Sequence, residues 1–317
     1  MRALLLIALL GAAAVHAQAW PAKPVRLIVP FPPGGAADAL PRIVADKLAE
    51  RWGQPVVIDN RAGASGNIGA EIVYRAEPDG YTFLATPPAP LVINPSLHAR
   101  MPYDATQFVP VAVMAAIPSV MLVHPKVPAT SVQEFVQLAR AHPGRLNYAS
   151  QGTTTVSFLT TEWFMAAAGG LKITHVPYKG TGPGLAALLA GEVDLMFDNL
   201  GTSLAQVRAG RLKALAVCGE KRVAALPDVP AMAEIYPGFV SIAWFGVVGP
   251  PRTSAAVAER AAAAILDALG DADVQQRLAR LSAEPVGMGP SQMASFLGEE
   301  RSRWQNAIRL AGVKPQE

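Results

Sequence analysis

Short apolar runs of strand length recur along most of the chain, and segments with a helical spacing of apolar residues separate many of them. The first such segment places Leu40, Ile43, Val44 and Leu48 on one helix face. Strands that alternate with helices of this length are typical of α/β proteins, in which helices flank mostly parallel sheets. The expected strands are 25–29, 56–58, 81–85, 109–113, 120–123, 146–149, 172–176, 193–197, 212–217 and 244–248, and the part from 254 to about 313 is expected to be helical apart from a short strand at 284–286.

The turn at residues 30–38 joins the first expected strand to the first expected helix. Its sequence, Pro-Phe-Pro-Pro-Gly-Gly-Ala-Ala-Asp, contains no Lys or Arg. In a doubly wound sheet such a turn lies at the carboxyl edge, where backbone N–H groups and the positive end of a helix can hold an anion. Gly34 and Gly35 could equally make a tight turn and nothing more. Asp38 would repel an anion, and as a helix N-cap it would place Pro41 in the first helical turn.

Three later turns carry polar groups at the same edge. Residues 150–155, Ser-Gln-Gly-Thr-Thr-Thr, precede a helical stripe, so their hydroxyls could hold a carboxylate oxygen or simply cap the helix. Tyr178 follows the next strand and could cover an aliphatic ligand while donating a hydrogen bond. At the end of another apolar strand, Asn199 could bind a ligand, whereas Asp198 would repel a carboxylate unless it orients amides or waters instead. The glycines at 180–184 make no dinucleotide fingerprint, because a proline interrupts the spacing and a leucine replaces the last glycine.

The first 19 residues have the pattern of a secretory signal peptide. Arg2 precedes an apolar run over 3–15, and small residues then predict cleavage near Ala17 or Ala19. The run is shorter than the roughly 20 residues that cross a bilayer, so we expect an exported mature chain. The single Cys218 cannot form an internal disulfide and is expected to be a buried thiol. The formal charge of +3 is scattered without a basic run, so nucleic acid is not indicated as a partner.

Signals of catalysis are missing from the sequence. No G-x-S-x-G elbow or comparable nucleophile motif is present. The histidines beyond the signal segment, His98, His124, His142 and His175, show no metal-ligand spacing. The carboxylate pair at 299–300 is expected on a solvated helix face. We therefore predict no catalytic residue, no metal site and no cofactor, in a protein that holds a small molecule rather than changing it.

The length of the mature chain, about 300 residues, suits two domains with a cleft between them. No linker marks a boundary, so the chain is expected to cross between the domains near Leu122 and again near Trp244. The prediction is a discontinuous first domain, 20–122 plus 245–317, and a second domain, 123–244. The two crossing strands would act as a hinge.

Ordered motifs over essentially the whole mature chain resemble the substrate-binding proteins of tripartite tricarboxylate transporters, also called Bug proteins. The matching segments are 29–35 with Asp38, 53–57, 60–70, 78–82, 93–97, 175–180, 195–199 and 226–230. The resemblance implies a periplasmic receptor with the two-domain, type II-like periplasmic binding protein fold. It also implies that the cleft closes on a small carboxylate, held mainly by backbone amides, hydroxyls and ordered water, and that the receptor delivers it to membrane permease subunits.

The resemblance also carries binding positions over to this chain, and Thr86, Thr154 and Asp198 are candidates beside them. The candidate ligand-binding residues are Phe31, Gly34, Gly35, Ala36 and Asp38 in the first turn, Thr86 after the third strand, Ser150, Gly152, Thr153, Thr154 and Thr155 in the second turn, and Tyr178, Asp198 and Asn199 beyond it.

Several of these positions, and their neighbours, depart from the family pattern. The family commonly has Ser or Thr near positions 36 and 37, Gly at 154, Ser at 156 and His at 158. The residues present instead are Ala36, Ala37, Thr154, Val156 and Phe158, and the segment 87–90, Pro-Pro-Ala-Pro, is unusually stiff. Together these departures predict a less polar pocket that favours an aromatic or longer aliphatic acid over citrate.

Two other functions stay open at this level. The closed receptor could report to a membrane sensor that regulates carboxylate uptake or catabolism, instead of serving a permease. An exported enzyme acting on carboxylic acids would need a nucleophile, base or metal set that the sequence does not display. A monomer is the default expectation, because a protein that opens and closes about a hinge gains nothing obvious from a locked interface.

Overall fold

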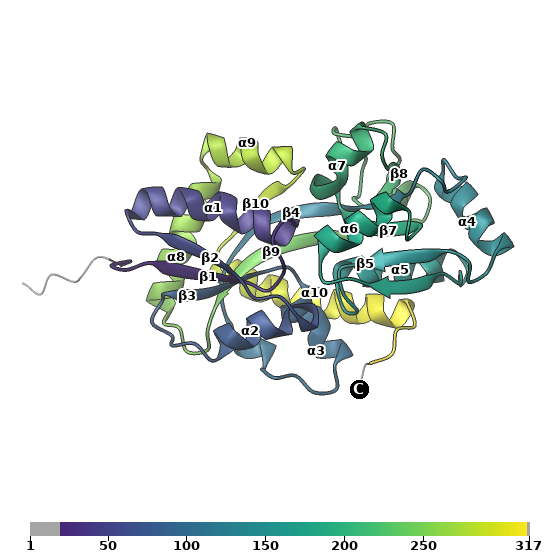
Figure 1. Cartoon of the computed structure of the whole chain (residues 1–317). Coiled ribbons are helices and arrows are strands. Elements are labelled where there is room, and N and C mark those ends of the chain that lie inside the picture. Colours follow the sequence, from purple (N-terminus) through teal and green to yellow (C-terminus); the bar gives the residue numbers. More distant parts are fainter. Residues whose placement is uncertain (1–19, 316–317) are drawn as a thin grey trace, which may run out of the picture.

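The computed structural model describes residues 20–315 (Figure 1). The expected signal peptide, with its cleavage near Ala17 or Ala19, lies outside the described residues. The strands are β1 (Val25–Val29), β2 (Val56–Asn60), β3 (Thr82–Thr86), β4 (Val109–Val123), β5 (Asn147–Ser150), β6 (Thr174–Pro177), β7 (Leu195–Asn199), β8 (Lys213–Val217), β9 (Ile242–Gly249) and β10 (Glu284–Met288). The α-helices are α1 (Ala36–Trp52), α2 (Asn67–Tyr74), α3 (Asn94–Leu97), α4 (Val132–Ala141), α5 (Val156–Ala167), α6 (Thr181–Ala190), α7 (Leu200–Arg208), α8 (Ala255–Leu269), α9 (Ala272–Arg280) and α10 (Pro290–Leu310).

The strands form one hydrogen-bonded path in the order β2-β1-β3-β9-β4-β7-β5-β6, and β8 and β10 also pair with β4. Strands β1, β2 and β3 are mutually parallel at one end, and β5, β6 and β7 are parallel at the other. We call the part built on β1–β3 the first half and the part built on β5–β7 the second half. The antiparallel pair β4 and β9 runs between them (Figure 1). The expected α/β fold, with helices flanking the sheet, is confirmed, although the parallel strands are confined to the two ends of the sheet and the strands between them pair antiparallel.

Strand β4 is a single strand where the sequence predicted two. Its residues 109–118 pair with β9, and its residues 119–123 pair with β7. The strand contains Pro110 and Pro118, and proline has no N–H to give to a ladder. Pro110 lies beside a shift in the register and Pro118 lies where the β9 pairing ends, so both occupy places where the ladder is already irregular. The strand therefore continues from one half of the sheet into the other.

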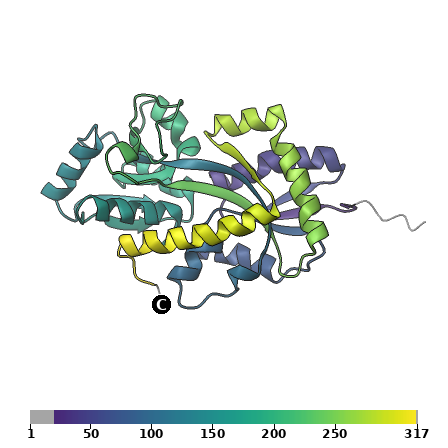
Figure 2. The same ribbon diagram turned by 180° about the vertical axis from the view of Figure 1, so that it is seen from behind.

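Helix α10 extends along both halves (Figure 2) and packs against β4 and α5. Its Glu300 is only 4% exposed and accepts hydrogen bonds from the indole Nε1 of Trp244 at 2.6 Å and of Trp304 at 3.0 Å. Arg303 Nη1 adds an ion pair at 2.7 Å. The expectation of a solvated carboxylate at this position is therefore wrong. A buried carboxylate is tolerated where it is both paired and hydrogen-bonded.

Candidate functional site

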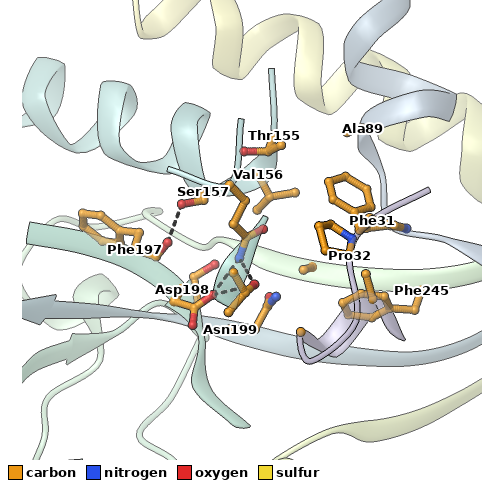
Figure 3. A pocket seen from close by; sticks show the side chains of 17 residues that line it. Phe31, Pro32, Ala89, Thr155, Val156, Ser157, Phe197, Asp198, Asn199 and Phe245 are labelled. Atoms are coloured by element: carbon orange, nitrogen blue, oxygen red, sulfur yellow. Dashed lines mark hydrogen bonds between the residues drawn. The ribbon is translucent and has the colours of Figure 1, made fainter. Parts of the chain in front are cut away.

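A cavity of about 550 Å³, counting its opening to solvent, lies between the two halves of the molecule. Figure 3 shows Phe31 and Phe245 on one side of this space and Asp198 and Asn199 on the other. The lining residues are Phe31, Pro32, Gly35, Ala37, Pro87 and Ala89 from the first half, Gln151, Thr155, Val156, Ser157, Thr181, Phe197, Asp198 and Asn199 from the second, and Ser119, Ala243 and Phe245 from β4 and β9.

Four helices begin at this cavity. Its lining includes Gly35 and Ala37 at the start of α1, Thr155–Ser157 at the start of α5, Thr181 at the start of α6 and Asn199 just before α7. The first backbone N–H groups of a helix have no partner within it and carry partial positive charge. Among the described residues, no Lys, Arg or His side chain lines the cavity. The lining hydroxyls of Thr155, Ser157 and Thr181 already donate within the protein, so the arrangement suits an anion held mainly by backbone amides.

Asp38 supports the first turn and does not line the cavity. Its carboxylate accepts hydrogen bonds from the Gly34 N–H at 3.2 Å, from Arg42 Nε at 2.9 Å and from Asn60 Nδ2 at 2.9 Å. Asn60 Nδ2 also donates to the Phe31 carbonyl at 2.9 Å. Burial alone would raise the pKa of Asp38, but these hydrogen bonds hold it below its usual value. The Gly34 N–H is thus already used within the protein.

Helix α1 begins earlier than the sequence predicted. Its N-cap is Gly35, so Asp38 lies inside the first turn and Pro41 lies in the helix interior. The expectation that Asp38 is the N-cap is wrong, because its side chain reaches back to the turn instead of to the next helical amides. A Cβ on Gly35 would lie 3.1 Å from Thr181 Oγ1, so glycine lets the first turn approach the second half closely.

The second turn is held together by hydroxyl groups. Ser150 Oγ and Thr155 Oγ1 each donate to the Gly152 carbonyl at 3.0 Å. Ser150 Oγ also lies 2.6 Å from His175 Nε2. Gly152 has a φ of +142°, and a Cβ on it would lie 2.9 Å from Ser65 Oγ of the first half. Only glycine fits that backbone conformation and that contact together.

Gln151 and Asp198 form a polar corner of the cavity. The Asp198 carboxylate accepts hydrogen bonds from Gln151 Nε2 and Thr202 Oγ1, each at 2.6 Å, and from Thr181 Oγ1 at 3.4 Å. Burial raises the pKa of this carboxyl. Gln151 Nε2 also donates to Thr181 Oγ1 at 2.9 Å, so both of its N–H groups are used. Asp198 therefore orients Gln151, as the sequence suggested for a carboxylate beside an anion site.

Thr154 joins the second turn to the first half. Its Oγ1 donates to Asn94 Oδ1 at 2.6 Å, and both residues are fully buried. Asn94 Nδ2 donates to the Ser65 carbonyl at 3.1 Å and to Asn67 Oδ1 at 2.6 Å. The Tyr103 hydroxyl also donates to Asn67 Oδ1, at 2.7 Å. Thr154 thus bridges the two halves and does not line the cavity.

The structure divides the candidate binding residues into three groups. Those that line the cavity are Phe31, Gly35, Thr155, Asp198 and Asn199. Those that line a second hollow, which adjoins the cavity at Phe31, Pro32 and Gln151, are Gly152, Thr153 and Tyr178. Those that line neither space are Gly34, Ala36, Asp38, Thr86, Ser150 and Thr154.

Sequence reasoning missed two kinds of lining residue. Gln151 and Thr181 lie in recognised turns, where a polar side chain beside glycine was the available signal. Ser119, Ala243 and Phe245 come from β4 and β9. A strand that is apolar throughout gives no sign of which face meets a ligand.

Within residues 20–315 the structure shows neither a metal-binding cluster nor a membrane-spanning helix. No group of three or more His, Cys, Asp or Glu side chains in this range could hold a metal ion. No helix within it has the length and apolar character needed to cross a membrane. Cys218 is buried, as expected, and burial raises the pKa of its thiol.

Comparisons with known proteins agree with the fold and with the sequence resemblance. The profile of the tripartite tricarboxylate transporter family receptor matches residues 40–313. Protein BugT of Bordetella pertussis is 37% identical over 306 residues, which cover 96% of this chain and 94% of that protein. The structure of R. palustris Rpa4515 with adipate has a TM-score of 0.90 and 37% identity, and covers 94% of this chain and 100% of that chain. MatC from Rhodopseudomonas palustris with bound malate has a TM-score of 0.86 and 32% identity, and covers 91% of this chain and 100% of that chain. The chain therefore belongs to the receptor family of tripartite tricarboxylate transporters, periplasmic solute-binding proteins that include the Bug proteins.

Proposed function

We propose that this chain captures a small carboxylate in the cavity and delivers it to the permease subunits of a tripartite tricarboxylate transporter. The observation that carries the proposal is the meeting of four helix N-termini at one cavity whose described lining has no cationic side chain. Several amide N–H groups that point toward the same place can hold a carboxylate without an ion pair. Helices α1 and α5 would supply them from the two halves of the molecule.

The ligands of two relatives support the same class of compound. Adipate, bound by Rpa4515, and malate, bound by MatC, are both small organic acids. These relatives share the fold over nearly the whole chain. We therefore propose that the ligand of this chain is a small organic acid. Which acid it binds depends on the residues that line its own cavity.

Capture requires that the cavity open and close. We assign the moving parts as residues 20–122 with 245–317 and residues 123–244, with β4 and β9 bending as the hinge. The buried hydrogen bond between Thr154 and Asn94 links these two parts beside the cavity, which is the kind of contact a closed state would use. A ligand that touches both parts would favour closure, and the permease would recognise the closed form.

A serine and a histidine near the cavity have the spacing of a catalytic pair, but their surroundings fit a binding protein. Ser150 Oγ and His175 Nε2 lie 2.6 Å apart, the spacing of a nucleophile and its base. Ser150 is fully buried, however, and its Oγ donates to the Gly152 carbonyl within the turn. A nucleophile must reach its substrate, so we assign this pair a structural role.

Calorimetric titration of the mature protein, unfolded and refolded to remove carried ligand, tests carboxylate capture. The panel pairs acids with their neutral amides: adipate with adipamide, hexanoate with hexanamide and benzoate with benzamide. We expect one-to-one binding of at least one acid, and binding of its amide that is weaker by about tenfold or more, because the amide brings no negative charge to the helix ends. Equal binding of an acid and its amide would contradict the proposal. Uptake of the bound acid that persists after deletion of the gene would contradict delivery.

A further inference from the structure

The cavity has a polar side and an apolar side. Its polar side chains come almost entirely from residues 151–199, at the ends of β5 and β7 and the starts of α5 and α6. Figure 3 shows Asp198 and Asn199 gathered away from Phe31 and Phe245. We define the apolar wall as Phe31, Pro87, Ala89, Ala243 and Phe245.

The apolar wall offers few hydrogen-bond donors. The segment 87–90 contains three prolines, which lack an N–H group. The Thr86 hydroxyl beside it is already used, because Thr86 Oγ1 donates to the Pro87 carbonyl at 3.0 Å. Ala243 and Phe245 lie in the β9 ladder, whose backbone pairs with β4. A charged group placed against this wall would find almost no partner.

The two sides therefore make opposite demands on a ligand. A carboxylate that leaves water needs hydrogen-bond donors in return, and the helix N-termini at the polar side provide them. A second carboxylate against the apolar wall would lose its hydration without replacement. A methylene chain or an aromatic ring would gain from burial at the same place.

We propose that the ligand is a monocarboxylic acid with an apolar body, a medium-chain aliphatic or an aromatic acid, rather than a dicarboxylate or tricarboxylate. This inference rests on the proposed function, because it takes carboxylate capture in the cavity as given. It adds the orientation: the carboxylate lies toward the start of α5, and the body lies against Phe245 and the segment 87–90.

Matched acids that differ by one carboxylate test the proposal. Calorimetry compares hexanoate with adipate and benzoate with terephthalate, on the refolded mature protein. In the pair that contains the tightest ligand, the affinity for the monocarboxylate should exceed that for the dicarboxylate by about tenfold or more. A smaller or reversed preference overturns the inference and leaves carboxylate capture standing. Binding of no acid at all overturns both.

Single substitutions test whether the apolar wall causes the preference for a monocarboxylate over a dicarboxylate. Ala89→Ser adds a hydroxyl to the apolar wall with little change in volume and should reduce the preference for the monocarboxylate by about threefold or more. Ala186→Ser makes the same change on the exposed face of α6, and should leave the preference unchanged. Ala243→Ser repeats the test if Ala89→Ser unfolds. An unchanged preference in a folded wall variant overturns the inference.

A dicarboxylate could instead extend into the second hollow, which Lys179 lines. The variant Lys179→Gln separates this arrangement from the proposed one. It should change the affinities for hexanoate and adipate by less than about twofold, because Lys179 does not line the cavity. A selective loss of adipate binding would place a second carboxylate in the hollow and overturn the inference.

Discussion

At the scale of single residues, burial sets the protonation state of the histidine behind the second turn. His175 stacks on Tyr148, with ring centroids 4.7 Å apart, and its Nε2 contacts Ser150 Oγ. Burial lowers the pKa of this imidazole to about 4. In the unfolded chain a histidine titrates near about 6.5, so between these values the unfolded chain binds a proton that the folded protein does not. The neutral His175 therefore contributes its full share to the free energy of unfolding above about pH 6.5, and this contribution is lost as the pH falls toward about 4.

Replacing His175 by glutamine should flatten this pH dependence. Glutamine can keep a hydrogen bond to Ser150 Oγ but does not titrate, so His175→Gln should lose less stability than the wild type between about pH 6.5 and 4.5. Urea unfolding at both pH values measures the free energy of unfolding. Burial raises the pKa of Glu162, so this residue makes the free energy of unfolding rise as the pH falls, in the wild type and in the variant alike. The difference in pH dependence between the two proteins therefore reports His175. An equal loss of stability in the two proteins would contradict this assignment.

At the scale of structural elements, the most informative link is the one between the second turn and α3. Thr154 Oγ1 donates to Asn94 Oδ1 at 2.6 Å in a network that is buried from water. Thr154→Ala would leave the Asn94 oxygen without this partner. We expect a loss of about 1–3 kcal/mol in the free energy of unfolding, the usual cost of an unsatisfied buried group. Ligand affinity should fall as well, because the turn would no longer be tied to the first half.

Chemical unfolding and calorimetry on the same variant separate these two effects. Thr174→Ala, at the exposed start of β6, makes the matched substitution away from the cavity. It removes only an exposed, 3.5 Å hydrogen bond to the Gly144 carbonyl, so both quantities should change much less than in Thr154→Ala. A loss of stability with unchanged affinity would show that the Thr154 bond supports the fold without supporting the ligand site.

The same elements show what a sequence can and cannot reveal. The turns at 30–38 and 150–155 were predictable, because glycine and hydroxyl residues after an apolar strand mark a local backbone conformation. The direction in which each side chain of a turn points was not predictable. Asp38 and Thr154 read as ligand contacts in the sequence, but partners from distant segments, Asn60 and Asn94, draw them away from the cavity. Phe245 was missed for a related reason, since an apolar strand does not show which face meets a ligand.

At the scale of the whole molecule, β4, β9 and α10 each extend along both halves. The two strands cross beside the cavity, whereas α10 lies along the back of both halves (Figure 2). Glu300 fixes this helix to β9 through Trp244. A hinge motion would therefore bend the strands while α10 limits how far the halves separate, and the halves would move as bodies rather than deform.

Closure can be measured between α1 and α6, which belong to different halves and both begin at the cavity. Spin labels on Glu50→Cys and Ala186→Cys occupy exposed positions on these helices. The native Cys218 should stay unlabelled, because it is fully buried and burial raises the pKa of its thiol. Double electron–electron resonance should show a label separation that becomes shorter and narrower on addition of the acid identified by calorimetry, and stays unchanged with its amide. A ligand that contacted both halves at once would shift the population toward the closed state. A distribution that does not respond to saturating acid would mean that the cavity binds without closing, and that the permease must recognise something other than closure.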